Sequence, residues 1–524
     1  MWASSGVLGL IAVGGIHIER IIRFQLDGQD VDVDDDGGSL LGALRDHLGV
    51  RSVKDGCSPQ GQCGCCTVLI DGSPRVACVT PLRRVAGRTV TTVDGLTEQE
   101  QRRWSDAFVA HGAAQCGFCT PGIVCRFVGH ERKGADLSLR ETVDRALSAH
   151  LCRCTGWQTI REAAAEVAVN FPGRDLDAAS QQATIETGTP QNIGPQVILG
   201  QGGFADDITP PHSLVAVRSG TGWVTATSLH QARENAGKIQ GRRTTLEALP
   251  PLEVPDGDWA VTLRTRWVEP AYLETDASWC SPDGESADPI ANGGAFGGKT
   301  GSDVGDVARA LAREHGVPVR VLWSREDTVR YGFKRPPIAA GLRRDGSGIV
   351  RVANTPGIAE VIHRVLPDCQ IEEIVVPGPP TSLSLRGAGW AEAEMLRASL
   401  DGEAGWVESP SGGRAKAEII DGSICIEVDG GQPLDWVMFR SYCIGAAHMG
   451  YSWVTSESLA VDMQGEVHDL TIRSFGVLRS SDSPNIEVNS VGQGEVRPVG
   501  DAVFAAVAAA TWLHRGCPID LPTG

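Results

Sequence analysis

The feature that most constrains this chain is the placement of its cysteines. Ten of the 15 cysteines precede residue 155, and the other five are scattered singly. A disulfide framework needs an oxidising compartment. The first 20 residues carry an apolar stretch with no basic residue ahead of it and no clear cleavage site, so we expect an extended start or a first strand rather than a cleaved signal. We therefore expect a cytoplasmic protein whose clustered cysteines hold metal.

Length and charge narrow the class further. A chain of 524 residues has room for three or four domains, and a hydrophobic content of 41% is that of a globular protein. The formal net charge of -18 argues against nucleic acid as a partner, because such proteins normally present a basic face. No apolar run reaches the roughly 18 residues that a membrane span needs.

The first cysteine group is Cys57, Cys63, Cys66 and Cys78, spaced C-x5-C-x2-C-x11-C. Plant-type iron–sulfur loops use C-x4-C-x2-C followed by a distant fourth cysteine. Nearby glycines allow tight turns, and they free backbone amides to bond the sulfurs. A structural zinc site is the alternative, although its cysteines usually come as two C-x2-C pairs. We expect Cys65 to be a small packing residue.

The second group pairs Cys116-x2-Cys119 with Cys152-x-Cys154. A C-x-C pair is unusual for zinc, whereas two irons can share ligands from such a pair. Cys125 falls on the interior face of a predicted helix, where a buried and inert thiol is expected.

The local patterns predict a β-rich start followed by helices. Alternating apolar residues from Ile22 to Val33, a helix capped by Ser39 and a strand over 67–70 favour a β-grasp arrangement. From about residue 95, capping boxes at Thr97 and Ser138 introduce helices that predict a four-helix bundle.

Three segments carry a family resemblance: DGCSPQGQCGCCTVLIDG, QCGFCTPGIV and LCRCTGW. They resemble the two-cluster N-terminal region of the molybdenum hydroxylases, the xanthine dehydrogenase and aldehyde oxidase family. The resemblance implies that the first group holds one 2Fe–2S cluster in a ferredoxin-like domain and the second group holds another in a helical domain. It also implies that Gln115 contacts the pterin. Two departures are an extra residue between Cys57 and Cys63, and His150 where the family usually has Asn.

Fragments of the C-terminal part resemble the molybdenum-binding region of the same family. GGAFGGKT resembles its Gly-Phe-Gly loop, LRGAG its Arg-Gly segment and GQGEV the segment that bears the catalytic glutamate. By this resemblance Phe296 and Gly297 line the molybdenum site, Arg386 neighbours the molybdopterin (possibly its cytosine dinucleotide form), and Glu495 is the general base. Such a base removes a proton from metal-bound water or hydroxide.

The expected fold class is α+β multidomain. We expect a β-grasp 2Fe–2S ferredoxin-like domain over 1–94, a 2Fe–2S-binding helical bundle over 95–170 and a linker over 171–196. A shortened, mixed α+β molybdopterin-binding-like region fills 197–524. That region is about half the family's usual length, and it lacks the Thr-Gln-x-Pro segment and the Gly-Gln-Gly loop.

Two functions stay open at this point. The first is an iron–sulfur oxidoreductase that hydroxylates an aldehyde or N-heterocycle at molybdenum and passes electrons through both clusters. Its acceptor is a separate FAD-binding subunit or another acceptor, because no flavin segment is recognisable. The second is a non-catalytic electron-transfer subunit whose degenerate C-terminal half docks a partner. GGAFGGKT also matches a phosphate-binding P-loop formally, but no buried strand leads into it, so we expect Lys299 to be a surface or packing residue.

Overall fold

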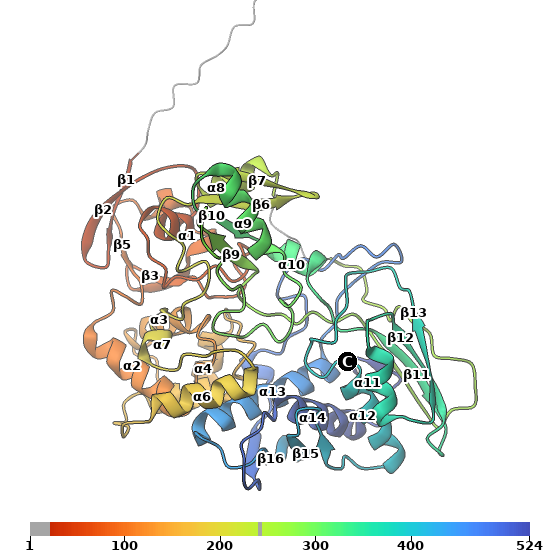
Figure 1. Ribbon diagram of the computed structural model, residues 1–524. Helices are drawn as coiled ribbons and strands as arrows, with labels where there is room; N and C mark the ends of the chain where they lie inside the picture. Colours follow the sequence, from red (N-terminus) through yellow and green to blue (C-terminus); the bar gives the residue numbers. More distant parts are fainter. Residues whose placement is uncertain (1–20, 239–243) are drawn as a thin grey trace, which may run out of the picture.

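The computed structural model describes residues 21–238 and 244–524 (Figure 1). Residues 1–20, for which the sequence predicts an extended start or a first strand, lie outside the described residues. Within the described ranges the chain forms four β-sheets and fourteen α-helices, so the predicted α+β multidomain class is confirmed. No helix in those ranges is long and apolar enough to cross a membrane.

The N-terminal sheet follows from simple alternation. Ile22, Phe24 and Leu26 are buried on one face of the first strand. The Ser39 side chain accepts a hydrogen bond from the Gly42 amide and begins a short helix, as predicted. That helix, α1 (Leu40–Gly42), continues as a π-helical turn over Ala43–His47. The sheet has the order β2-β1-β5-β3-β4 and is formed by β1 (Ile21–Leu26), β2 (Gln29–Asp34), β3 (Thr67–Ile70), β4 (Ser73–Val76) and β5 (Thr89–Thr91).

Four helices follow. The capping box at Thr97 forms as predicted, because its hydroxyl accepts from the Glu100 amide and Glu100 accepts from the Thr97 amide. The box predicted at Ser138 does not form, since its hydroxyl donates to Asp136 at 2.6 Å and Leu139 is the N-cap instead. The helices are α2 (Glu98–His111), α3 (Thr120–Glu131), α4 (Arg140–Leu147) and α5 (Gln158–Ala165).

The segment expected to be a linker, 171–196, contains a helix. Asp175 caps α6 (Leu176–Thr187), and a short helix, α7 (Pro195–Ile198), begins at the end of the segment. Ala179 and Ala183 of α6 are fully buried in a cluster that also holds Met438 of a later helix. Alanine gives a weak periodicity signal, and the contact partner is about 250 residues away in sequence, so the local pattern did not reveal this helix.

Three further sheets build the C-terminal region. The first has the order β7-β6-β10-β9, the second β13-β12-β11-β8-β18 and the third β14-β15-β16-β17. Their strands are β6 (Leu214–Ser219), β7 (Gly222–Ala226), β8 (Val261–Thr265), β9 (Ala277–Cys280), β10 (Val319–Leu322), β11 (Ile338–Leu342), β12 (Gly348–Ala353), β13 (Cys369–Ile374), β14 (Val407–Glu408), β15 (Arg414–Ile420), β16 (Ser423–Asp429), β17 (Ile486–Ser490) and β18 (Asp520–Leu521).

Two long helices, α13 (Trp436–Thr455) and α14 (Gly500–His514), form the centre of this region and lie below the N-terminal domains in Figure 1. A Cβ atom at Gly450 would lie 2.5 Å from the Phe504 carbonyl oxygen, so only glycine allows this close helix crossing. The Trp453 and Phe504 rings stack across the same crossing, with centroids 5.3 Å apart. The remaining helices are α8 (Leu229–Asn235), α9 (Val304–His315), α10 (Arg325–Tyr331), α11 (Ile358–Val365) and α12 (Trp390–Asp401).

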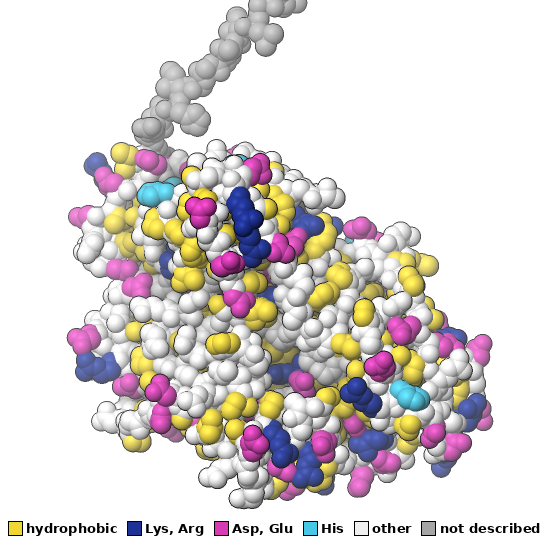
Figure 2. Space-filling view, in the orientation of Figure 1, with side chains coloured by type: hydrophobic (Ala, Val, Ile, Leu, Met, Phe, Trp, Pro, Cys, Tyr) yellow, Lys and Arg dark blue, Asp and Glu magenta, His cyan; other side chains and the backbone are white. Residues whose placement is uncertain are grey.

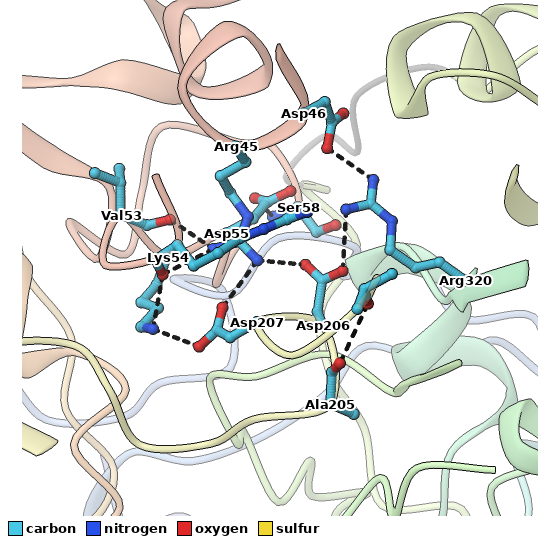
Figure 3. A network of polar contacts seen from close by, with 12 residues as sticks. Arg45, Asp46, Val53, Lys54, Asp55, Ser58, Ala205, Asp206, Asp207 and Arg320 are labelled. Carbon is cyan, nitrogen blue, oxygen red and sulfur yellow. Dashed lines mark hydrogen bonds and ion pairs between the residues drawn. The ribbon is translucent and has the colours of Figure 1, made fainter. Parts of the chain in front are cut away.

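Acidic and basic side chains are interspersed over the face of the molecule drawn in Figure 2. Inside, a network of buried charges joins the N-terminal domain to the C-terminal region (Figure 3). Arg45 donates to Asp206 at 2.6 Å and to Asp207 at 2.9 Å, and Lys54 also pairs with Asp207. Arg320 of β10 lies 3.2 Å from Asp206. Because Arg45 and Arg320 flank Asp206, they hold the pKa of that carboxyl well below its usual range despite its burial.

Removing Arg45 leaves two buried carboxylates short of a partner. We expect Arg45→Met to lower the free energy of unfolding by about 3–5 kcal/mol. Urea denaturation followed by tryptophan fluorescence measures it. Arg23→Met is the matched control, because Arg23 pairs with Asp32 while its side chain is 77% exposed, and such pairs contribute about 0–1 kcal/mol. Equal small losses in both variants would show that the buried network is not stabilising.

Candidate metal centres

The first cysteine group is gathered in one place. Hydrogen bonds from the thiols of Cys63 and Cys78 hold the pKa of Cys57 well below its ordinary value, and Cys66 contacts Cys78 in turn. All four side chains are buried. Backbone amides also point at the sulfurs, since Gln60 N lies 3.1 Å from Cys57 Sγ and Cys78 N lies 3.4 Å from Cys66 Sγ. The four predicted ligands therefore form one contiguous set.

The second group forms two close pairs. Cys116 Sγ and Cys154 Sγ are 3.5 Å apart. The Cys119 thiol hydrogen-bonds to Cys152 and lowers the pKa of Cys152 to about 6. Gly294 closes one side, because a Cβ atom there would lie 3.0 Å from Cys116 Sγ. Helix α3 starts directly after Cys119, so the bundle itself positions this ligand.

Neither group is built for a single ion. Within residues 21–238 and 244–524, no three His, Cys, Asp or Glu side chains surround a point suited to one metal ion. A tetrahedral zinc site needs four ligands around one point, whereas a 2Fe–2S cluster takes two cysteines on each of two irons. Paired thiols therefore favour the cluster over zinc. The thiol pairs and the amides aimed at sulfur fit a 2Fe–2S group in both places.

The two cysteine groups touch through the backbone. Leu151 N, one residue before Cys152, donates to the carbonyl of Cys63 at 2.9 Å. Gly64 lies against His150, where a Cβ atom would sit 2.6 Å from the imidazole Nδ1. Cys65, predicted to be a packing residue, is buried between the two groups and contacts Cys63. His150 is thus a packing residue in the seam between the two cysteine loops.

Buried arginines hold both loops against the C-terminal region. Arg325 donates to the carbonyl of Gly56 at 2.6 Å and to that of Tyr272 at 2.8 Å. Arg153, between two predicted ligands, forms a bidentate pair with Glu457 at 2.5 and 2.8 Å. The sequence did not single out either arginine. For Arg153, the only sequence signal was its position between the two cysteines of the C-x-C motif, where a long charged side chain has to point away from the cluster.

The residues predicted to hold the pterin are only partly brought together. Phe296 and Arg386 line one cavity, with the Arg386 guanidinium 5.2 Å from the Phe296 ring centroid. Gly297 faces the other way, toward the Ser384 carbonyl. Gln115 is buried near Cys154, but its amide donates to both the carbonyl and the hydroxyl of Ser441 on α13, each at 3.1 Å.

The predicted base lies apart from that cavity. Glu495 is exposed in the loop between β17 and α14 and does not line the cavity. The N-terminus of α14 is instead occupied by Glu186, which accepts a hydrogen bond from the Val499 amide at 3.1 Å. Glu186 comes from α6, the helix that the sequence did not reveal.

Lys299 is a buried packing residue. It pairs with Glu274 at 2.5 Å and donates to the Pro289 carbonyl at 2.9 Å, and no strand leads into its loop. Burial raises the pKa of Glu274 to about 7. The local structure therefore does not have the form of a phosphate-binding loop.

Comparison with known proteins connects these observations. Residues 92–165 match the family described as "[2Fe-2S] binding domain". The aldehyde oxidoreductase of Megalodesulfovibrio gigas is 39% identical over 161 residues, which are 30% of this chain and 17% of that protein. The alpha subunit of isoquinoline 1-oxidoreductase from Brevundimonas diminuta is 36% identical over 143 residues, which are 27% of this chain and 93% of that subunit. The chain belongs to the molybdenum hydroxylase family. The cofactors of this family of oxidoreductases are 2Fe–2S clusters and molybdopterin.

The fold match extends further than the sequence match. The structure of the aldehyde oxidoreductase from Desulfovibrio desulfuricans aligns with a TM-score of 0.69, covering 94% of this chain and 97% of that one at 14% identity. The C-terminal region therefore shares the family's fold. The segment of clear sequence similarity nevertheless spans only about one sixth of the M. gigas protein's length.

The molybdopterin fits less well than the clusters. The cavity beside Phe296 and Arg386 has a volume of about 30 Å³, enough for one or two water molecules. Pockets for cofactors are typically about 300–1,000 Å³. Arg386 is also already engaged, with Asp501 at 3.3 Å. The side chains as placed therefore do not accommodate a pterin.

Changing one ligand of the second group should remove one cluster and leave the other. We expect Cys116→Ser to lose one of two paramagnetic signals of the reduced protein and about half of its iron. Electron paramagnetic resonance and iron analysis measure this. Cys125→Ser is the control, because Cys125 is equally buried but lies outside both groups. Two intact signals in Cys116→Ser would overturn the ligand assignment.

The buried Glu186 predicts a pH effect. Burial raises its pKa from 4.5 to about 7, so the folded state holds a proton that the unfolded state releases. Its contribution to stability is complete below about pH 4.5 and is lost as the pH rises to about 7. We expect wild type to lose about 1 kcal/mol per pH unit relative to Glu186→Gln across this window, measured by urea denaturation.

Glu98→Gln serves as the control for that series, because the Glu98 side chain is 84% exposed on α2. It should follow wild type at every pH. A constant difference between wild type and Glu186→Gln would show that the carboxyl does not titrate in this range.

Proposed function

We propose that the chain is an iron–sulfur oxidoreductase in which electrons pass between two 2Fe–2S clusters. The second group (Cys116, Cys119, Cys152 and Cys154) receives them, and the first group (Cys57, Cys63, Cys66 and Cys78) delivers them to an external acceptor. The observation that carries this proposal is the backbone hydrogen bond from Leu151 to Cys63, which places the two ligand loops in direct contact.

The fit of each loop to its cluster supports the same proposal. The thiols are buried, paired and met by backbone amides, and the reduction potential of such a cluster depends on exactly those hydrogen bonds and on burial. Arg153 and Arg325 fix the loops from the opposite side. Rigid positioning keeps the distance between the clusters constant, as electron transfer requires.

The source of the electrons has two candidates. In the first, this chain would hold a molybdenum cofactor, which would supply the hydroxylation chemistry for an aldehyde or N-heterocycle. Gln115, Phe296, Gly297 and Arg386 would then contact the cofactor, and Glu495 would be the general base. In the second, the chain is a non-catalytic electron-transfer subunit whose C-terminal half docks the electron donor. The small volume of the cavity at Arg386 favours the second candidate.

The acceptor is either a separate FAD-binding subunit or another electron acceptor. Cytoplasmic localisation remains a prediction from the cysteine pattern.

Metal content tests the proposal. The full chain is purified from a host that makes molybdopterin, and iron and molybdenum are quantified per chain. We expect about four irons, two for each cluster. Equimolar molybdenum supports the hydroxylase and contradicts the non-catalytic candidate, and its absence does the reverse. Fewer than about two irons per chain would overturn the electron-transfer proposal itself.

A further inference from the structure

A cavity of about 600 Å³ lies between the N-terminal domain and the sheet that contains β10. Its size is in the range typical of small-molecule sites. One wall is the charge network of Figure 3, with Arg45, Asp206 and Asp207 among the lining residues. Leu229 of α8 and Leu322 of β10 line the opposite side. The cavity therefore exists only because the two parts of the chain pack together.

The cavity borders the first cysteine group and approaches the second. Cys78, a ligand in the first group, and its neighbour Val79 line it directly. Phe118 and Phe204 also line it, and their rings meet edge to face at 5.0 Å. The same two rings line the small space around the second cysteine group. A molecule in the cavity would touch a ligand of one cluster and would be separated from the other by one layer of aromatic side chains.

The buried and half-buried cations on the walls are already paired. Arg45 is paired with Asp206 and Asp207, Arg233 with Asp55, and Lys238 with Asp327. An anionic ligand that engaged Arg45, Arg233 or Lys238 would have to break its pair, which is costly for buried groups. An uncharged ligand would leave these ion pairs intact.

The Glu274 carboxylate pairs with Lys299 through one oxygen, and its other oxygen faces no partner in the part of the chain that the structure describes. Glu274 is 8% exposed and lines the cavity, and its Oε1 atom has no hydrogen-bond partner among the described residues. A buried oxygen of this kind is normally paired with a protein group, a water or a ligand. It can accept a hydrogen bond from a ligand hydroxyl.

We propose that this cavity binds an uncharged, planar quinone, which is the electron acceptor of the first cluster. The inference rests on the proposed electron path through the clusters and names its acceptor. The aromatic pair contacts the flat ring, and Glu274 accepts a hydrogen bond from the hydroxyl of the reduced form. Cys78 supplies the contact to the cluster.

The reaction balances without further reagents. Each reduced 2Fe–2S cluster gives up one electron and returns to its oxidised form. The quinone takes the two electrons together with two protons from solvent, so that its two carbonyl oxygens become the hydroxyls of the hydroquinone. No group is transferred to the protein.

The test uses the full chain with its clusters and the water-soluble probe 2,3-dimethoxy-5-methyl-1,4-benzoquinone. Binding to the oxidised protein is measured by equilibrium dialysis, and reoxidation of the dithionite-reduced clusters by stopped-flow absorbance. We expect saturable binding and a reoxidation rate that saturates with quinone concentration. Leu229→Trp, which places a larger side chain on the cavity wall and narrows it, should weaken binding at least about tenfold with the cluster spectrum unchanged.

Gln231→Trp is the matched control, because Gln231 is an exposed residue of α8 that does not line the cavity. It should bind the quinone as wild type does. His230→Trp, at the exposed rim, is a second blocking variant if Leu229→Trp does not fold.

Any of three results would overturn the quinone site. The reoxidation rate could rise linearly with quinone concentration without saturating, or the Leu229→Trp and Gln231→Trp variants could bind the quinone equally well. In the third, flavin mononucleotide, an anion, would displace the quinone. The cluster spectrum is recorded first. Its absence would overturn the proposed function, whereas dialysis still reports on the cavity independently of the clusters.

Discussion

The structure depends on guanidinium groups that the C-terminal region and the cysteine domains share. Arg45, Arg153 and Arg325 are each at most 5% exposed, and each bonds to groups from a distant part of the chain. A buried guanidinium stays charged, so it must keep its partners. Separating the two halves would leave these charges and their carboxylates unpaired. The cysteine loops and the C-terminal region therefore form one body.

This constraint gives the C-terminal region a role that does not need a pterin. Helix α13 packs so closely on the second cysteine loop that a Cβ atom at Gly445 would lie 1.8 Å from the Cys154 carbonyl oxygen. Gln115 hydrogen-bonds to the same helix. The region thus covers the second cysteine group, shields it from water and supplies one wall of the cavity beside Cys78. A shortened relative of a cofactor domain can stabilise an electron path in this way.

Local sequence signals predicted most of the N-terminal half. The alternation of Ile22, Phe24 and Leu26, the Ser39 cap and the Thr97 capping box each depend on residues within a few positions, and each formed. The failure at Ser138 has a local reason as well, because Asp136 competes for its hydroxyl. Helix α6 was missed because its buried face holds only alanine and polar residues and its partner is distant.

The candidate site was likewise predictable only in part. The spacing of the eight cysteines was enough to propose two groups, and the structure gathers each group. Spacing could not show that Leu151 bonds to Cys63, or that His150 fills the seam at Gly64. In the C-terminal half, the structure places Phe296 beside Arg386, and the motif fragments could not show that the cavity between them is small.

The sequence by itself determined which cysteines belong to each of the two groups and where several N-terminal strands and helices begin, because residue type, spacing and helix caps are local properties. Only the tertiary structure decided how those segments face each other, that the cavity beside Phe296 and Arg386 is small and that a larger cavity opens beside Cys78. Cavities and buried ion pairs depend on which distant surfaces meet. Which surfaces meet is decided by the packing of side chains that are hundreds of residues apart in sequence, and no local pattern encodes that packing.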